Sequence, residues 1–299
     1  MSNPVKGLKQ AKPYIHLYRN EIFVLKVGGG VLANQTSTKQ LAEQISLLTD
    51  LGMKIIIVHG GGPQATAFTK KLGQEPVMVA GRRVTDDDAL EVAKMIYAGK
   101  LNSEFVAVLN NNEVAAVGLS GIDGNTITAT KRPPVNITDD DGENKIVDFG
   151  NVGDIDSINT KLLDNLLKDE FVPVLCCLGV GKNGNIYNIN GDSIAQSLAM
   201  AMKARKLIFI TNSDGLLSNP DDASSLIPFA DKEELFTLIN DGAINTGMRP
   251  KIDACINAVE NGVERTHIIN GHVEDALLIE LFTGEGIGTM IVNTREEQK

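Results

Sequence analysis

Two glycine triplets follow apolar segments that have the composition of buried strands. The first lies in KVGGG, where IFVLKV (22–27) leads into glycines 28–30, and the second, glycines 60–62, begins at the end of KIIIVHG (54–60). Glycine lets a ligand approach the main chain closely, and clustered backbone N–H groups form a concavity that binds anions. One triplet alone could be a tight strand-to-helix turn. Two such triplets favour an anion-binding site.

The glycine spacing distinguishes between kinds of anion site. The P-loop pattern GxxxxGK[ST] is absent from the sequence. GGGPQA (60–65) fits the loose dinucleotide fingerprint GxGxxA, but the acid expected about 20 residues later falls in AGRRVTDDD (80–88), which has the composition of a loop entering a helix. Pro63 suits the first position of a helix whose positive end faces the bound group. Dinucleotide binding is therefore disfavoured.

Two lysines occupy unusual positions for a cation. Lys26 lies inside the apolar segment 22–27, where it either extends toward solvent from a strand end or contacts the anion at the glycines. Lys251 stands with Arg249 at the start of an expected helix, 250–262, where the helix macrodipole disfavours a cation by about 0.3–1 kcal/mol. A bound anion would reverse that sign. Both lysines are therefore candidates for contacting a phosphate. The simpler alternative is that both side chains are exposed to solvent.

Asp192 precedes another expected helix, 192–204, in YNINGDSIAQ. Ser193 and Gln196 have the spacing of a capping box, so Ser193 is expected to cap this helix. Asp192 is then either an ordinary helix-start residue or an acid that is free to hold the two lysines.

The remaining reactive side chains divide into binding and structural groups. An arginine suits bidentate pairing with a substrate carboxylate, and the spacing of AGRRVT does not choose between Arg82 and Arg83. His59 has no Ser or Cys partner at catalytic spacing and is interpreted as structural. The cysteines lack CxxC or Cys/His spacing, so no metal site is predicted and reduced core thiols are expected at Cys176, Cys177 and Cys255.

Short apolar segments alternate with helical patterns along most of the chain. This alternation predicts an α/β fold with an open, mainly parallel sheet sandwiched by helices and divided into two lobes. Residues 125–157 are rich in Thr, Val and turn residues, which favours hairpins. A lobe boundary is expected near 203–206. The expected strands are 22–27, 54–60, 115–120, 171–179, 206–212, 266–270 and 289–293, and the clearest helices are 38–52, 87–111, 192–204 and 250–262.

Composition excludes several classes of protein. The 299 residues include 38 acidic and 28 basic side chains, and the formal net charge of -10 disfavours nucleic acid or an anionic membrane surface as partner. No apolar segment approaches the roughly 18 residues of a membrane span, and the first 20 residues lack the apolar core of a signal peptide. A cytoplasmic protein is expected, with local positive charge wherever an anionic ligand binds.

An ordered set of motifs is similar to one known family. KVGGG, VHGGGPQA, GRRVT, AVGLSGIDGN, NINGDSIAQSLA, GMRPKIDACINAV and HIINGHVEDALLIELFTGEGIGTMI together resemble the acetylglutamate kinases of the amino acid kinase family. The resemblance covers nearly the whole chain, and the ordered set is far more specific than any single motif. It implies an N-terminal arm or helix (1–20), an amino-acid-substrate lobe (21–203) and a nucleotide-binding lobe (204–299).

Matching the motifs residue by residue implies a role for each candidate. Lys26 and Lys251 resemble the lysines that stabilise the transferring phosphoryl group, and Asp192 resembles the acid that organises them. This match also selects Arg83 over Arg82. The positions that resemble the substrate-binding ones are Gly61, Gly62, Arg83 and Asn188, and those that resemble the nucleotide-binding ones are Gly28, Gly29, Asn212, Gly215 and Met248.

The chain departs from the family pattern at several positions. Asn212 stands where the family usually has an aspartate, and Asp214 is a candidate substitute. Thr246 replaces the first glycine of the usual GGM, and Ile122 replaces the lysine of GKDG. Two interpretations of these departures stay open: an altered affinity for the nucleotide, or a relative of the family with a different function.

The first residues of the chain resemble a regulatory element. AKPYIHLYRN is similar to the N-terminal helix of arginine-inhibited, hexameric members of the family, although a frayed terminus is the simpler alternative. The resemblance implies an allosteric arginine site that involves His267 and Glu280, while His272 and Asp275 depart from the usual Arg and His there. It also implies a homo-oligomer, either a dimer or a hexamer. The sequence does not indicate whether a signalling protein binds.

The resemblance implies ATP-dependent phosphorylation of the γ-carboxylate of N-acetyl-L-glutamate, a step of arginine biosynthesis. A carboxylate with a reference pKa near 4.3 is ionised at neutral pH and needs no general base, so ATP with Mg²⁺, the lysines and backbone N–H groups carry the chemistry. Two alternatives stay open. One is a kinase for a related acid such as N-acetyl-aminoadipate, since one methylene is worth only about 1–3 kcal/mol. The other is a noncatalytic arginine sensor.

Overall fold

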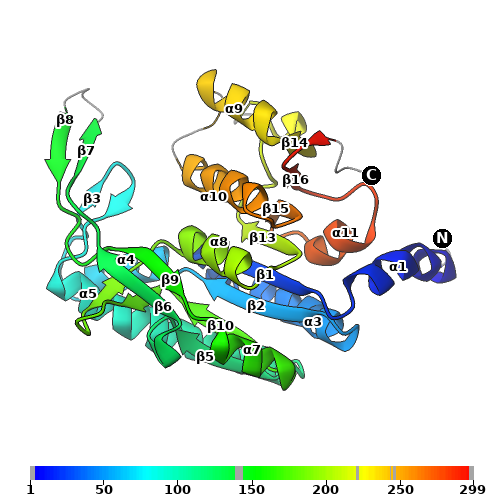
Figure 1. Cartoon of the computed structure of the whole chain (residues 1–299), viewed down its shortest axis with the longest axis horizontal. Coiled ribbons are helices and arrows are strands. Elements are labelled where there is room, and N and C mark those ends of the chain that lie inside the picture. The colour runs from blue at the N-terminus through cyan, green and yellow to red at the C-terminus, as the bar shows by residue number, and fades with distance from the viewer. Residues whose placement is uncertain (1–3, 139–143, 220–221, 243, 245–246, 296–299) are drawn as a thin grey trace.

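An eight-stranded sheet forms the centre of the molecule, in the order β14-β16-β15-β13-β1-β2-β10-β5 (Figure 1). The computed structural model describes residues 4–138, 144–219, 222–242, 244 and 247–295. The strands from β15 to β5 in this order are parallel, and β16 is antiparallel to β15. Their bounds are β1 (Ile22–Val27), β2 (Lys54–His59), β5 (Ala116–Ser120), β10 (Val172–Cys176), β13 (Lys206–Thr211), β14 (Phe229–Asp231), β15 (Arg265–Asn270) and β16 (Thr289–Val292).

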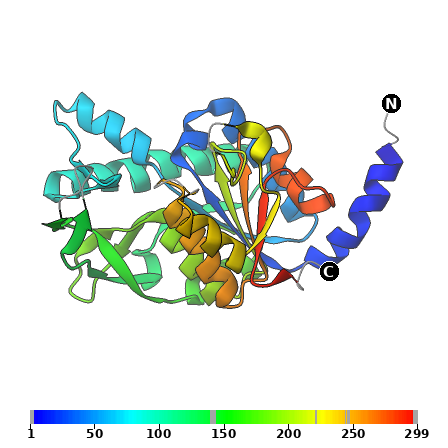
Figure 2. The ribbon, with the colours of Figure 1, turned by 90° about the horizontal axis from the view of Figure 1, so that it is seen from above.

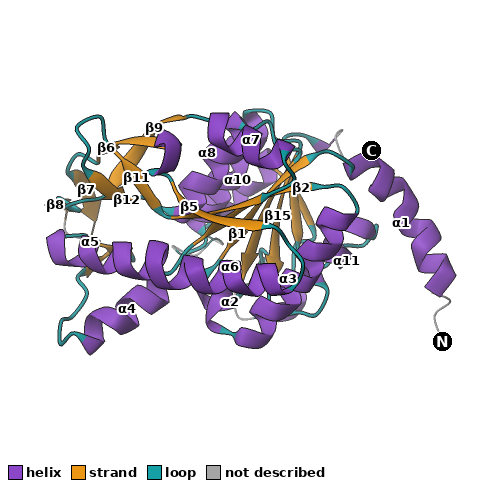
Figure 3. Cartoon of the chain, turned by 90° about the horizontal axis from the view of Figure 1, so that it is seen from below, coloured by secondary structure: helices purple, strands orange, loops and turns teal. Residues whose placement is uncertain are grey.

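Helices cover both faces of this sheet, so the expected α/β sandwich is confirmed (Figure 3). Each face has its own apolar core, because buried parallel strands present apolar side chains on both sides. One core packs α1 (Pro4–Tyr18), α3 (Gln35–Asp50), α6 (Asn102–Asn111) and α11 (Ala276–Phe282). The other packs α7 (Lys161–Lys168), α8 (Gly191–Ala201) and α10 (Arg249–Glu260).

Smaller sheets lie at one end of the large one, beyond β5 (Figure 1). The expected hairpins of 125–157 are confirmed, because β6 (Ile127–Lys131) pairs with β9 (Gly153–Ile158) and β7 (Val135–Thr138) pairs with β8 (Asn144–Val147), both antiparallel. The remaining pairs are β3 (Met78–Val79) with β4 (Arg82–Arg83), and β11 (Leu178–Val180) with β12 (Ile186–Asn188).

The prediction of a single strand over residues 171–179 is wrong. The chain forms β10 in the large sheet, turns at Cys177 and forms β11 in the four-stranded sheet β12-β11-β6-β9. Both strands are buried. The apolar sequence therefore continues where the chain leaves one sheet and enters the other. Hydrophobic periodicity alone does not indicate this change of sheet. The predicted helix 87–111 is a continuous rod in which α5 (Asp87–Ala93) passes through π-helical Lys94–Leu101 into α6.

β1 is the point where the strand order reverses, since β2 lies on one side of it and β13 on the other. In open α/β sheets, ligands bind outside the carboxyl ends of the strands at such a point. Both glycine triplets lie there. The chain passes from α8 into β13 across residues 203–206, where we propose the boundary between the lobes. Within the described ranges, no helix combines the length and apolarity needed to cross a membrane.

Candidate active site

The two glycine loops touch each other at the carboxyl ends of β1 and β2. The first opens α2 (Gly29–Ala33) and the second opens α4 (Gly62–Lys71). A Cβ on Gly29 would lie 3.2 Å from Gly61 Cα and 2.9 Å from the Oε1 of Gln64, so a side chain at position 29 would separate the loops. Gln64 Nε2 donates a 2.6 Å hydrogen bond to Gly29 O. This hydrogen bond joins the two loops. No sequence motif predicts it, because Gln64 and Gly29 are far apart in the sequence.

Lys26, Asp192 and Lys251 converge beside these loops. Lys26 Nζ lies 2.8 Å from Asp192 Oδ1, and Lys251 Nζ lies 3.1 Å from Asp192 Oδ2. The three side chains come from the end of β1, the first turn of α8 and the first turn of α10, and α8 and α10 pack together over the sheet (Figure 2). One carboxylate therefore holds two amino groups from distant parts of the sequence.

The electrostatics of this cluster favour an ionised aspartate. The side chains are only 13%, 14% and 11% exposed for Lys26, Asp192 and Lys251. Burial alone would raise the pKa of Asp192, but Lys26 and Lys251 outweigh it and lower that pKa to about 2. Burial lowers the pKa of Lys251, which Asp192 opposes. Lys251 Nζ also lies 5.0 Å from the centroid of the Phe209 ring, whose face attracts a cation.

The N-cap of α8 differs from the predicted one. Asn190, not Ser193, caps the helix, and its side-chain oxygen accepts from the backbone N–H groups of Asp192 (2.7 Å) and Ser193 (3.3 Å). The helix begins one residue earlier than expected, so Asn190 takes the position from which Asn caps well. The consequence for Asp192 is the same, because its carboxylate stays free for the lysines.

A cavity of about 730 Å³ lies between α4, α8, α10 and the small hairpins. Gly62, Arg83 and Asn188 line it, as do Asn190 and Ser193 at the start of α8. Arg83 Nη2 donates to Thr66 Oγ1 (2.5 Å) and to Gly62 O (3.3 Å), while Asn188 Nδ2 donates to Thr85 Oγ1 (3.1 Å). Arg82 lines the same cavity but is exposed.

Gly61 has a packing role beside this cavity. A Cβ on Gly61 would lie 2.4 Å from Leu101 Cδ1 and 2.7 Å from Tyr97 Cδ1, so only glycine fits against the π-helical turn. That contact holds the second glycine loop close to Lys94–Leu101. No local sequence pattern indicates this constraint, because Leu101 lies far from the loop along the chain.

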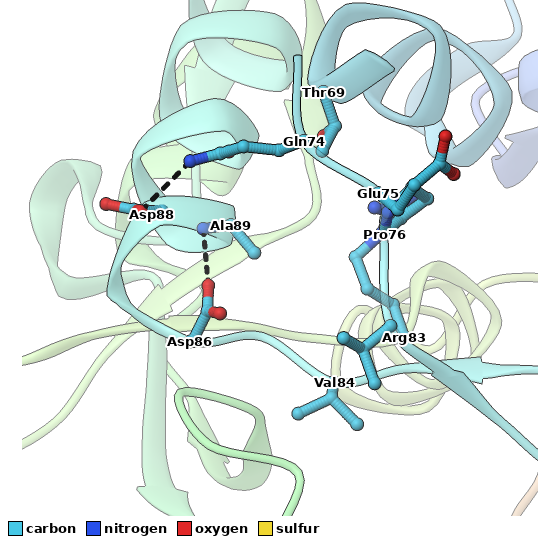
Figure 4. Close-up of a pocket in the computed structure, with 10 residues that line it drawn as sticks. Thr69, Gln74, Glu75, Pro76, Arg83, Val84, Asp86, Asp88 and Ala89 are labelled. Carbon is cyan, nitrogen blue, oxygen red and sulfur yellow. Dashed lines mark hydrogen bonds between the residues drawn. The ribbon is translucent and has the colours of Figure 1, made fainter. Parts of the chain in front are cut away.

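Arg83 also borders a smaller cavity of about 300 Å³, whose lining residues are drawn in Figure 4. Its acidic lining residues serve local structure. Asp86 caps α5 by accepting from the backbone N–H of Ala89 (2.8 Å), and Asp88 accepts from Gln74 Nε2 (3.1 Å). Arg83 thus stands in the wall between the two cavities, with its guanidinium fixed by α4 on the side of the larger one.

The residues matched to nucleotide binding lie at the carboxyl ends of β1 and β13 and at the start of α10. Gly28 N donates to Ile210 O (2.9 Å), which ties the first glycine loop to β13. Gly215 has φ +146°, and a Cβ there would lie 2.6 Å from Thr289 Oγ1, so glycine is required by the backbone and by the space. Met248 is the N-cap residue of α10. Thr246 lies outside the described residues.

Two departures from the family pattern have definite surroundings. Asp214 Oδ1 accepts from Asn270 Nδ2 (2.7 Å), so this carboxylate is directed toward the end of β15. Ile122 is partly buried and packs against the core on the face of the sheet that α7, α8 and α10 cover. The proposal that Asp214 takes the place of the missing aspartate thus requires it to act while bonded to Asn270.

The residues interpreted as structural lie in the core. His59 is buried, its Nε2 lies 3.1 Å from Asn102 Nδ2, and burial lowers its pKa to about 4. Cys176, Cys177 and Cys255 are free and buried. Cys177 Sγ donates to His59 O at 3.0 Å, which fixes the end of β2.

His267 and Glu280 form a second buried cluster at the opposite ends of the strands. His267 Nδ1 lies 2.6 Å from Glu280 Oε1, and its Nε2 lies 2.8 Å from Lys206 Nζ. Burial lowers the pKa of His267 to about 4 and that of Lys206 to about 7. Burial would raise the pKa of Glu280, but its hydrogen bond with His267 helps to lower it to about 2. A cavity of about 370 Å³ adjoins them, lined also by Tyr14, Tyr18 and Arg265.

Comparisons with known proteins agree with the resemblance. The model of the amino acid kinase family matches residues 21–270. An acetylglutamate kinase from Caldicellulosiruptor saccharolyticus is 43% identical over 284 residues, which are 95% of this chain and 94% of that protein. An N-acetylglutamate synthase from Neisseria gonorrhoeae, complexed with coenzyme A and N-acetyl-glutamate, is 31% identical with a TM-score of 0.83, covering 98% of this chain and 64% of that one.

The same synthase complexed with coenzyme A and L-arginine gives a TM-score of 0.85 at 29% identity, covering 98% of this chain and 66% of that chain. This chain therefore spans about two thirds of the synthase but almost the full length of the kinase. The family model and the full-length kinase relative point to one assignment. The chain belongs to the amino acid kinase family, and within it to the acetylglutamate kinases.

Proposed function

We propose that this protein transfers the γ-phosphoryl group of ATP to the γ-carboxylate of N-acetyl-L-glutamate, within arginine biosynthesis. The observation that carries the proposal is the cluster of Lys26, Asp192 and Lys251, which lies beside the glycine loops and next to the 730 Å³ cavity. The full-length relatives named acetylglutamate kinase support the same activity.

The proposed reaction needs positioning and charge stabilisation more than acid–base chemistry. A γ-carboxylate oxygen forms the new bond to the γ-phosphorus, the bond from that phosphorus to the β,γ-bridging oxygen breaks, and ADP leaves with the electron pair. Charge accumulates on the transferring oxygens and the bridging oxygen. Lys26 and Lys251 are placed to meet this charge, and Asp192 holds their amino groups in position without itself gaining a proton.

In this proposal, Arg83 pairs with the α-carboxylate of the substrate and Asn188 binds its acetamido group. Gly61 and Gly62 supply backbone N–H groups near the γ-carboxylate, and Gly28 and Gly29 supply them near the phosphates. Asn212, Gly215 and Met248 border the nucleotide. Gly62, Arg83 and Asn188 line the larger cavity, and the other residues lie at the carboxyl ends of β1, β2 and β13 or at the start of α10.

The Mg²⁺ of MgATP would neutralise charge on the polyphosphate. Among the described residues, no group of three or more His, Cys, Asp and Glu side chains is placed to hold a metal ion. Mg²⁺ usually keeps several waters and binds substrate phosphates with one or two carboxylates. Asp192 is already bonded to two lysines, so we propose that Mg²⁺ arrives with the nucleotide rather than at a resident site.

A hydroxylamine trap tests the reaction directly. Purified protein with MgATP, N-acetyl-L-glutamate and hydroxylamine should accumulate the hydroxamate in proportion to ADP, because hydroxylamine attacks an acyl phosphate. ADP release without hydroxamate would contradict acyl-phosphate formation. Competing N-acetyl-aminoadipate in the same assay compares kcat/KM for the two acids, and a preference for the longer acid would support the alternative substrate. Arginine binding without any turnover would support the sensor.

Arg83→Ala should raise KM for N-acetyl-L-glutamate by about 10- to 100-fold with a smaller effect on KM for MgATP, because a charge-assisted hydrogen bond is worth roughly 1.5–3 kcal/mol. The matched control is Arg82→Ala, which removes the neighbouring guanidinium from the exposed side of the same hairpin. Steady-state kinetics in both substrates measures the effect. Equal changes in the two variants would contradict the choice of Arg83.

We further propose that arginine inhibits the enzyme by binding in the 370 Å³ cavity beside α1. Glu280 offers a carboxylate for a guanidinium, and Lys206 and Arg265 offer cations for an α-carboxylate. The relative from Neisseria gonorrhoeae is a synthase seen with L-arginine. α1 extends away from the body of the molecule (Figure 2), which suits contact with a second copy in a dimer or hexamer.

Glu280→Gln should abolish arginine inhibition while turnover without arginine stays within about twofold, because the loss of one charge removes the partner of the guanidinium. The amide oxygen can still accept from the backbone N–H groups of Ile287 and Gly288, which the native carboxylate accepts at 2.8 and 3.1 Å. The measurement is the activity of both proteins as a function of arginine concentration. Unchanged inhibition in Glu280→Gln would place the effector elsewhere.

A further inference from the structure

A buried imidazole at the end of β2 contacts the main chain of the second glycine loop. His59 Nδ1 lies 3.0 Å from Gly60 O, and His59 Nε2 lies 3.1 Å from Asn102 Nδ2. Asn102 Nδ2 also lies 2.9 Å from Val174 O and 3.4 Å from Leu119 O. His59 is completely buried, and Asn102 is 5% exposed. A polar pair therefore lies inside the core next to the loop.

Two main-chain carbonyls fix the orientation of the Asn102 amide. Val174 O and Leu119 O can only accept, so the atom of the amide that faces them is the nitrogen. In the flipped amide, Oδ1 would face two carbonyl oxygens with no proton between them. A Cβ on Gly118 would lie 2.0 Å from Asn102 Oδ1, so the glycine at position 118 leaves room for the amide.

The neighbours of the His59 ring determine which of its nitrogens carries the proton. Gly60 O can only accept, so Nδ1, which faces it, is protonated. Nε2 faces the donor Asn102 Nδ2 and is therefore unprotonated. The opposite tautomer would place a lone pair against the carbonyl oxygen and a proton against the amide N–H. Burial lowers the pKa of His59 to about 4, which keeps the ring neutral near pH 7. His59 therefore donates to Gly60 O.

This hydrogen bond sets the direction of the Gly61 N–H. The peptide that joins Gly60 and Gly61 is planar and trans, so the N–H points opposite to the C=O. Because the carbonyl is directed at the His59 ring, the N–H is directed away from it. Gly60 N donates to Val27 O at 3.0 Å, which fixes the other side of Gly60.

Gly61 is itself buried. Among the described residues, no main-chain carbonyl accepts from its N–H. A buried backbone donor needs a partner, and a ligand held at the glycine loops can supply one.

We infer that His59 is a positioning residue for phosphoryl transfer, which acts through Gly60 O to hold the Gly61 N–H in the direction of the reacting γ-carboxylate. This inference rests on the proposed kinase function and deepens it. The imidazole transfers no proton, because its N–H is bonded to Gly60 O and its other nitrogen accepts from Asn102. A donor that is oriented in advance stabilises transition-state charge without reorganisation during the reaction. The polar pair in the core thus serves the chemistry without touching the substrate.

Two amide side chains test the two ring nitrogens separately. An asparagine at position 59 places its amide near the position of Nδ1, and a glutamine places its amide near the position of Nε2. His59→Leu should lower kcat by about 10- to 100-fold, because a misdirected donor loses much of its effect on the transition state. His59→Asn should restore most of this loss, and His59→Gln should not. KM for MgATP should stay nearly unchanged in all three variants, since the donor acts on the carboxylate.

Thermal unfolding is measured beside the kinetics, because each change at position 59 alters the core. The matched control is Thr69→Val, which removes a buried hydrogen bond from Thr69 Oγ1 to Ala65 O (2.9 Å) in α4 and leaves Gly60 untouched. This variant should lose thermal stability and keep its kcat. If His59→Asn and His59→Gln have equal kcat values, or if kcat in the series only follows thermal stability, His59 is structural and the inference is wrong.

The tautomer is observed in the wild-type protein, so this arm does not depend on how well the variants fold. The chain has 4 histidines, and the signal that is absent from a folded His59 variant identifies His59 in the nitrogen-15 spectrum of histidine-labelled protein. The expected chemical shifts are those of a neutral ring with a protonated Nδ1 and an unprotonated Nε2. A proton on Nε2, in either the neutral or the charged ring, would overturn the inference.

The two levels of the proposal fail in different ways. If wild-type protein yields no hydroxamate, the proposed kinase reaction fails, and the role of His59 in that reaction fails with it. If wild-type protein yields hydroxamate and His59→Leu has the same kcat, the kinase proposal stands and only this inference is wrong.

Discussion

Lys251→Ala is expected to lower kcat by about 100- to 1000-fold, the cost of removing one preorganised donor that meets transition-state charge. Lys251 Nζ is held 3.1 Å from Asp192 Oδ2 at the first turn of α10. Its amino group is therefore positioned before substrate arrives, and no reorganisation is needed during phosphoryl transfer. KM values should change much less than kcat, because the interaction is strongest in the transition state.

The matched control for Lys251→Ala is Arg249→Ala. Arg249 lies in the same turn of α10, but its side chain is 48% exposed and paired with Asp253 on the surface. Removing it deletes the same charge from the same helix end, so a loss that depends only on net charge would appear in both variants. Lys26→Ala should behave as Lys251→Ala does. Near-normal kcat in both lysine variants, with thermal unfolding unchanged, would refute their proposed roles.

Asp192→Asn is expected to be the second most damaging change, because it lowers both activity and stability. The substitution leaves the buried amino groups of Lys26 and Lys251 without their shared carboxylate. Removing one partner of a buried charge pair typically costs about 3–5 kcal/mol. kcat should fall by at least about tenfold, since the lysines lose the geometry that the transferring group requires. Urea unfolding and steady-state kinetics measure the two effects separately.

The stability effect of Asp192 should depend on pH in a defined direction. Its pKa is lowered from 3.8 to about 2 in the folded protein. A group whose pKa is lowered on folding stabilises the protein at pH values above its unfolded-state pKa, here by on the order of 2 kcal/mol. This stabilisation is lost as the pH falls through the folded-state pKa. The difference in unfolding free energy between wild type and Asp192→Asn should therefore be constant above pH 5 and shrink between about pH 4 and pH 2.

The matched variant for this measurement is Asp253→Asn, an exposed acid whose partner Arg249 is on the surface. Surface ion pairs contribute roughly 0–1 kcal/mol, so its difference from wild type should be small and nearly flat with pH. A difference for Asp192→Asn that does not shrink in acid would mean that the carboxylate is not the group stabilised by the two lysines.

Local signals in the sequence were enough to predict much of this molecule. Apolar runs bounded by turn residues gave six of the strands of the large sheet to within a residue or two at each end, and Thr- and Val-rich segments gave the hairpins. The unusual residue types at glycines 28–30, Lys26 and Lys251 pointed to an anion site. Such signals are contained within about ten residues of chain, which is the range over which helix period, strand alternation and turn chemistry act.

Features that depend on sheet order could not be obtained in this way. Asp192 meets Lys251 across 59 residues, and Ser37 meets His272 across 235 residues. No local pattern encodes that β13 and β2 lie on opposite sides of β1. That arrangement alone brings the ends of these strands, and the helices that follow them, around one site.

Ser193 and the run 171–179 show the same limit at short range. Serine and asparagine cap helices about equally well, so the start of α8 was decided by where the chain enters from β12. Strands buried in two different sheets have the same apolar composition, so the turn at Cys177 was decided by which neighbours were present for pairing. The sequence by itself determined which residues are able to do chemistry, and the tertiary structure decided which of them meet, because partners are selected by packing between elements and not by spacing along the chain.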